Sequence, residues 1–170
     1  MQDAWAAPAG LREEQMRTHF AEILARESAC LAGVTDGAKL AGWRRRVVEE
    51  LMTPRSPYAL ALRRTGDVPE RADFLGRWRG LIEEAVDRLL QADATLCTTR
   101  SATQATSNGN DVDPHKTAVL ILAALHGGST LSQIAQDPRP LNAALDIALA
   151  PLGATEDVNS GDTTTERVNQ

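Results

Sequence analysis

Aromatic residues are scarce in this sequence: they make up 4% of its 170 residues, so its core must be built mainly from Leu, Ala, Ile and Val. Long hydrophobic runs are missing too. The longest strongly apolar run covers residues 117–125, far short of the ~20 residues of a membrane-spanning helix. Residues 1–10 lack the positive cluster and apolar stretch of a secretory signal. We therefore expect a cytoplasmic protein with no membrane partner.

Cysteine and histidine are too few and too scattered for a metal site. Cys30 and Cys97 lie far apart with no CxxC motif, and no histidine has a second ligand at i+3 or i+4. The GxSxG, P-loop, GxGxxG and HExxH motifs are all absent. Adjacent acidic pairs such as Glu49-Glu50 diverge by about 100° on a helix and cannot share a substrate. We expect reduced thiols, no metal, no cofactor and no catalytic residues, and thus no enzyme.

Positive charge is in deficit, since 18 Lys and Arg stand against 23 Asp and Glu, for a formal net charge of -5. A protein that neutralises phosphates needs a basic surface, so the chain as a whole is not built as a free-standing nucleic-acid binder. The one tight basic run, Arg44 to Arg46, fans across a wide arc of a helix, which indicates a solvated face.

Apolar residues recur at helical spacing, and no segment alternates at the period of a strand. The pattern predicts helices from Leu11 to Leu31, from an Asp36 N-cap to just before Pro54, and from about Pro69 to Ala92. A short apolar turn, Ala59 to Leu62, is expected between the last two. Two more helices follow, opened by Asp113-Pro114 and by Asp137-Pro138, and the chain is predicted to be an all-α multi-helix bundle.

Composition divides the chain into three parts. Residues 1–10 are expected to be a linker, residues 11–152 one helical domain, and residues 153–170 a disordered tail. Inside the domain, residues 94–112 are rich in Thr, Ser, Asn and Gly, which predicts a mobile loop.

The last two helices carry more apolar surface than one layer of helices can cover. Ala118 to Leu125 is apolar almost all round, and Gly127 and Gly128 follow at a cost of ~1 kcal/mol each relative to Ala. Close approach by another helix explains such glycines, and the surplus apolar surface of the two helices predicts a helical dimer interface. The alternative is that both are core helices of a monomer. The expected interface residues are Leu125, Gly127, Gly128, Leu131, Leu141, Ala144, Leu145, Ala148 and Leu149.

Large rings gather on the helices that would surround an internal cavity. Ligand sites are mainly apolar with a few polar groups, so these rings and their apolar neighbours predict a pocket for a small molecule. Tyr58, with its hydroxyl on a turn, is the best candidate to orient the ligand, and the alternative is ordinary core packing. The expected pocket residues are Phe20, Trp43, Leu51, Tyr58, Phe74, Trp78 and Ile82.

The stretch Asp113-Pro114…Ala118…Leu125-His126-Gly127-Gly128…Leu131…Gln133…Asp137…Pro140-Leu141…Ala144-Leu145-Asp146 resembles the end of a TetR-family transcriptional regulator. Ser56-Pro57-Tyr58, followed by a helix with Trp78, fits the same pattern, and the resemblance covers roughly Asp36 to Leu152. Ser129, Thr130 and Ser132 depart from it, since relatives tend to be apolar there.

The resemblance implies a sensor domain that binds a small apolar effector and dimerises through its last two helices, which form a four-helix interface in a homodimer. Family members carry an N-terminal helix-turn-helix domain, and no such signature precedes residue 36 here. Operator DNA is therefore expected only through an N-terminal domain not present in this chain, and the expected role is that of a repressor that releases DNA on binding its effector. A small all-α enzyme with an unadvertised site and an orphan helical interaction module are the alternatives.

Overall fold

The computed structural model describes residues 9–63, 69–100 and 112–153. All regular structure in these residues is helical, which confirms the all-α prediction. The elements are α1 (Ala9–Ala32), α2 (Gly37–Met52), α3 (Pro57–Arg63), α4 (Pro69–Arg100), α5 (Pro114–Ala135), α6 (Arg139–Leu149) and a closing 3-10 turn, η1 (Ala150–Leu152).

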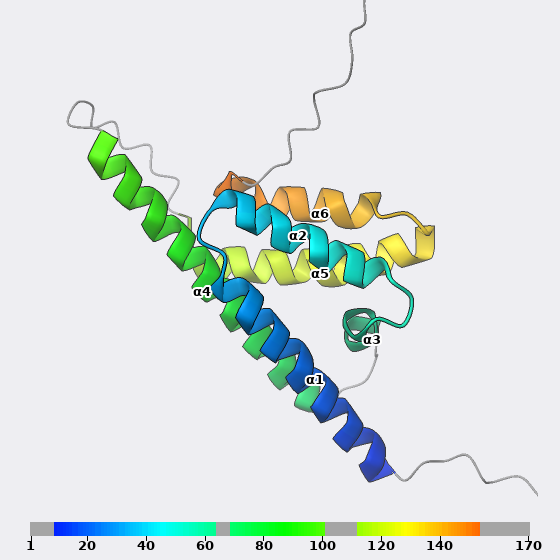
Figure 1. Cartoon of the computed structure of the whole chain (residues 1–170). Helices are drawn as coiled ribbons and strands as arrows, with labels where there is room; N and C mark the ends of the chain where they lie inside the picture. The colour runs from blue at the N-terminus through cyan, green and yellow to red at the C-terminus, as the bar shows by residue number, and fades with distance from the viewer. Residues whose placement is uncertain (1–8, 64–68, 101–111, 154–170) are drawn as a thin grey trace, which may run out of the picture.

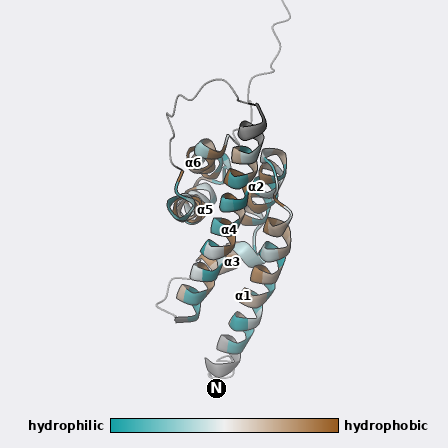
Figure 2. Ribbon diagram, turned by 90° about the vertical axis from the view of Figure 1, so that its left-hand side faces the viewer, coloured by the Kyte–Doolittle hydropathy of each residue, from teal (hydrophilic) through white to brown (hydrophobic). Residues whose placement is uncertain are grey.

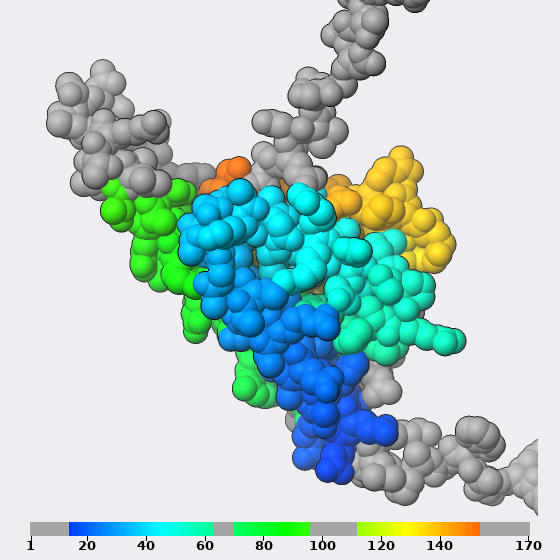
Figure 3. Space-filling model, viewed as in Figure 1, coloured from blue at the N-terminus to red at the C-terminus, as the bar shows by residue number. Residues whose placement is uncertain are grey.

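Two long helices and a group of shorter ones make up the fold. Helices α1 and α4 run side by side along one diagonal, while α2, α5 and α6 lie across them as a second group (Figure 1). In the turned view of Figure 2, α5 and α6 are seen nearly end-on, beside the α1–α4 pair. Helices α1 and α2 form much of the surface seen in Figure 3. The core lies where the two groups meet.

Local side chains set the predicted helix starts. The Asp36 carboxylate accepts the backbone N–H of Lys39 at 2.9 Å, and Asp113 accepts those of His115 and Lys116 at 2.9 and 3.3 Å. Both N-caps are therefore confirmed, with Pro114 in the first turn of α5 as expected. Because these N–H groups stabilise the charged carboxylate, the pKa values of Asp36 and Asp113 are lowered below the ordinary 3.8.

Three local predictions need correction. The apolar turn after Tyr58 is the helix α3, which Ser56 caps by accepting the backbone N–H of Ala59 at 3.1 Å. Helix α4 continues to Arg100, so the first part of the predicted loop at residues 94–112 is helical, and residues 101–111 lie outside the described residues. The basic run on α2 is no solvated face either, because Arg44 is 4% exposed and its neighbour Arg46 is half-buried.

Helices α5 and α6 contact each other more extensively than any other pair of described helices, and Gly128 allows their close approach. A Cβ added at Gly128 would lie 2.9 Å from the Cα of Leu141 and 3.3 Å from the Cβ of Ala144. The close approach that the glycine pair predicts is thus made by α6 of the same chain. Ser132 accepts the backbone N–H of Leu141 at 2.9 Å, so this buried hydroxyl on α5 satisfies an amide in the first turn of α6.

Helix α5 is long and apolar enough, by length and composition, to cross a membrane. Core helices of soluble proteins pass the same test, and 39% of its most apolar window is buried inside the fold.

Candidate functional site

The structure gathers the seven predicted pocket residues into one core, where every one is buried. Phe20 stacks on Phe74 with ring centroids 4.4 Å apart, and Tyr58 meets Trp78 edge-on at 5.8 Å. Leu51 and Trp78 are both fully buried. The rings thus pack against one another between the helices, and a ligand pocket formed by these residues stays a prediction.

A carboxylate that the sequence analysis did not single out lies at the centre of these rings. Glu27 of α1 is fully buried. Its Oε1 accepts the Tyr58 hydroxyl at 2.7 Å and a guanidinium N–H of Arg46 at 3.1 Å. Its Oε2 accepts the indole N–H groups of Trp43 and Trp78 at 2.9 and 3.2 Å. One carboxylate therefore ties α1 to α2, α3 and α4.

The donors around Glu27 saturate it. A carboxylate offers about four acceptor sites, and four donors occupy them, with Arg46 supplying the opposite charge. Burial, with the nearby carboxylate, raises the pKa of Tyr58 far above its ordinary value of 10, so the phenol keeps its proton and donates. No lone pair is left to hold a ligand, and the centre acts as a polar joint between helices.

A sequence signal for this centre existed. Phe20, Ile23, Leu24 and Leu31 define the buried stripe of α1, and Glu27 falls on the same stripe at helical spacing. A charged residue on an apolar stripe needs a partner, since burying an unpaired charge is very costly. The partners themselves could not be read from local spacing.

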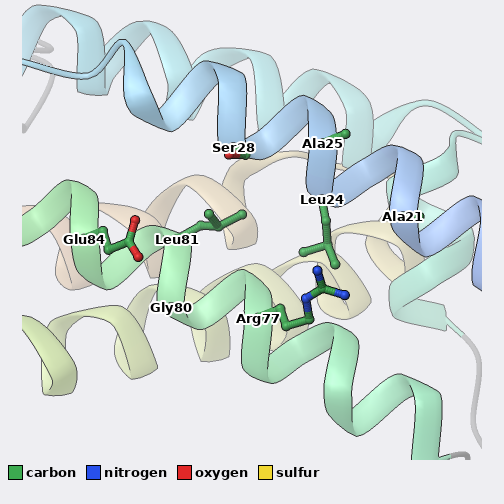
Figure 4. Close-up of a pocket in the computed structure, with 8 residues that line it drawn as sticks. All are labelled: Ala21, Leu24, Ala25, Ser28, Arg77, Gly80, Leu81 and Glu84. Atoms are coloured by element: carbon green, nitrogen blue, oxygen red, sulfur yellow. The ribbon is translucent and has the colours of Figure 1, made fainter.

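Open space lies instead between α1 and α4. A cleft of about 440 Å³ opens there to solvent. Figure 4 shows that Leu24 and Arg77 project into it from opposite helices. The cleft is lined by Ala21, Leu24, Ala25 and Ser28 of α1 and by Arg77, Gly80, Leu81 and Glu84 of α4.

Two further hollows flank this cleft. One, of about 270 Å³, shares Ala21, Leu24 and Arg77 with it and reaches the predicted pocket residues Phe20 and Phe74. The other, of about 490 Å³, shares Gly80 and Glu84 and continues to the start of α5. Part of the predicted pocket therefore borders an accessible groove, while Trp43, Leu51, Tyr58, Trp78 and Ile82 line none of these three hollows.

No family model, curated protein or solved structure matches this chain. Evidence on its function therefore comes from its own surfaces and contacts.

The residues expected at a dimer interface fall into two groups. Gly127 and Leu131 are exposed on α5, and Ala144 is half-buried. The rest are buried within this chain: Leu125, Gly128, Leu141, Leu145, Ala148 and Leu149. Because these six residues are buried within one chain, a partner could reach only the first group. The homodimer itself stays a prediction.

Another set of apolar residues on α5 is open to solvent. Five exposed residues lie along one side of the helix by their spacing, and we call them the α5 stripe: Val119, Ala123, Gly127, Leu131 and Ile134. That side faces away from the buried residues of α5. On α6, Ile147 is 78% exposed, as is Ile134. Helices α5 and α6 thus keep surplus apolar surface after packing on each other.

Helix α2 connects the Glu27 centre to α6. Trp43 and Arg46 bind Glu27, while Arg44 between them points to α6. Its guanidinium lies 2.8 Å from the carboxylate of Asp146 and 3.2 Å from the side-chain oxygen of Asn142. The Arg44 side chain is only 5% exposed, so this contact fixes where α6 sits relative to α2.

Proposed function

We propose that this chain is the ligand-sensing and dimerisation domain of a TetR-like transcriptional repressor. The observation that carries the proposal is where the exposed apolar side chains lie. Among the described residues, every large apolar side chain that is exposed, except Leu60, belongs to α5 or α6: Val119, Leu120, Leu131, Ile134 and Ile147. Exposed apolar surface concentrated in this way is typical of a protein interface.

A homodimer suits the shape of this surface. The α5 stripe runs along the helix axis, so a two-fold axis can lay one stripe against its copy, and each residue is then used twice. Ile134 and Ile147 are the most exposed of these side chains, at 78% each. Fully burying a side chain of this size stabilises an assembly by about 1.5–3 kcal/mol, so a few such contacts support a stable pair.

The effector site in this proposal is the α1–α4 cleft. A ligand between these helices would change the position of α1, and Glu27 would move with it. Trp43 and Arg46 of α2 follow Glu27 through their hydrogen bonds, and Arg44 passes the shift to Asp146 on α6. A changed α6 would alter the angle between protomers, and attached DNA-binding heads would lose the spacing of their half-sites.

Sedimentation equilibrium tests the dimer. We expect the wild-type chain to be a dimer at micromolar concentration and Ile134→Glu to be a folded monomer, because a charge on the stripe cannot be paired there. Leu60→Glu is the matched control: Leu60 is an exposed leucine, 41% accessible, on α3. This control should remain dimeric.

A monomeric wild type would overturn the dimer. A Leu60→Glu variant that dissociates as readily as Ile134→Glu would overturn the exposed side of α5 as its interface. A monomer that keeps the same apolar surface would favour the orphan interaction module instead, with a different protein on α5.

A further inference from the structure

The α1–α4 cleft has an apolar body. Leu24 and Leu81 supply its larger side chains, and Ala21 and Ala25 keep the α1 wall shallow. At Gly80 the space is open, because a Cβ added there would meet no heavy atom within 4 Å. A volume of about 440 Å³ falls within the range of sites for small organic molecules.

One end of the cleft is acidic. Glu84 lines both the cleft and the neighbouring hollow of about 490 Å³, and its exposed carboxylate makes no hydrogen bond or ion pair within the described part of the chain. The neighbouring hollow adds three carboxylates that already have partners: Glu83 lies 3.0 Å from the His115 ring, Asp113 lies 3.5 Å from the Lys116 ammonium, and Asp87 accepts the Gln91 amide at 2.7 Å. An open carboxylate beside others of the same sign favours a cation there.

Arg77, at the other end of the cleft, does not cancel the negative charge near Glu84. Arg77 lies 3.8 Å from the carboxylate of Asp73, one turn earlier on α4. In the adjoining hollow, Arg17 is matched by Glu70 at 4.0 Å. Both guanidinium groups thus have an acidic neighbour. The next guanidinium along α4, that of Arg88, donates to the backbone carbonyls of Glu84, Ala32 and Leu31 at 3.1, 2.9 and 2.9 Å, and not to the Glu84 carboxylate.

We propose that the cleft binds an organic cation with an apolar body, which lies against Leu24 and Leu81 and places its charge at Glu84. This inference rests on the effector-sensing role proposed above and gives the chemical class of the effector. An exposed ion pair contributes little by itself. Neither a bare ammonium ion nor an uncharged hydrocarbon uses both halves of the cleft, so charge and apolar contact must belong to one molecule.

Isothermal titration with three probes tests the inference. 4-Phenylbutyl-trimethylammonium carries both features, tetramethylammonium only the charge, and 4-phenylbutyrate an apolar body one methylene shorter with the opposite charge. We expect only the first to bind, with an affinity that falls as salt is added. Equal binding of 4-phenylbutyrate, or no binding of the first probe, would overturn the proposal.

Two variants place the probe in the cleft. Glu84→Gln should weaken binding about three- to fivefold, the range of an exposed ion pair. Gly80→Leu should weaken it more than about tenfold, because the new side chain occupies the open space and suits a helix better than glycine. Glu49→Gln, an exposed carboxylate on α2, is the control and should bind like wild type. Unchanged affinity in both cleft variants places the probe elsewhere and overturns the inference.

Sedimentation of the same samples separates this inference from the proposed function. A dimer that binds none of the probes refutes the cationic ligand and leaves the dimerising sensor standing. A monomer that binds the first probe through Glu84 refutes the dimer and leaves the cleft as a cation site.

Discussion

Trp43 donates its indole N–H to Glu27 across the α1–α2 contact at 2.9 Å, with both side chains buried. Trp78 donates to the same oxygen from α4 at 3.2 Å. Two tryptophans on different helices are thus oriented by one carboxylate, and this arrangement makes the core directional. An apolar core could slide along its helices, whereas these donors each have one position that satisfies them.

Glu27→Ala should lower the free energy of unfolding by about 3 kcal/mol, because it leaves four donors without their acceptor. The loss stays below that of a fully buried ion pair, since the Arg46 side chain is 33% exposed and can turn to water. Urea denaturation followed by tryptophan fluorescence measures it. Glu22→Ala, an exposed glutamate on the same helix, should stay within about 0.5 kcal/mol of wild type. Equal stability of both variants would contradict the role of Glu27.

Gly128→Ala should destabilise the protomer by about 1–3 kcal/mol, even though alanine is the better helix former. The new Cβ would lie 2.9 Å from the backbone of Leu141, and a backbone atom cannot move aside as a side-chain tip can. Gly127→Ala is the matched control. No heavy atom lies within 4 Å of a Cβ there, so it should raise stability by up to about 1 kcal/mol. Thermal unfolding of both distinguishes them, and equal shifts would show that α6 does not approach at Gly128.

Asp146→Asn should cost about 1 kcal/mol, because it removes the charge partner of a nearly buried guanidinium. The cost is moderate since the Asp146 side chain is 46% exposed and water screens the pair. Asp93→Asn on α4, also an exposed aspartate, should change stability little. Chemical denaturation gives both values. If the two variants behave alike, the α2–α6 link through Arg44 contributes nothing to stability.

The lowered pKa values of Asp36 and Asp113 predict that the folded protein loses stability in acid. Their pKa values are lowered in the folded protein mainly by the backbone N–H groups of Lys39 and Lys116. A lowered folded-state pKa stabilises the protein above the unfolded value of about 3.8, and this contribution is lost as the pH falls through the folded value. Asn still caps a helix but does not titrate. The double variant Asp36→Asn, Asp113→Asn should therefore show a smaller fall in melting temperature below about pH 4 than wild type. Parallel pH profiles would contradict this.

The sequence by itself determined the described α-helices other than α3, and most of their ends. Asp36 and Asp113 act on amides two or three residues away, and Pro54 lies beyond the end of α2 at Met52, so these boundaries depend on short stretches of chain. The buried rings were predictable for a similar reason, because large apolar side chains at helical spacing face the core. The helix over residues 94–100 was missed since its polar residues carry no apolar period.

Only the tertiary structure decided what those helices meet. Three of the donors to Glu27, namely Trp43, Tyr58 and Trp78, lie 16, 31 and 51 residues further along the chain. Arg44 binds Asn142, which is 98 residues away in the sequence. Local spacing could predict that another helix comes close at Gly128, but not that the helix is α6 of the same chain. Helix formation depends on neighbours within about four positions, whereas the partner of a buried charge or of a bare glycine is set by how whole helices pack.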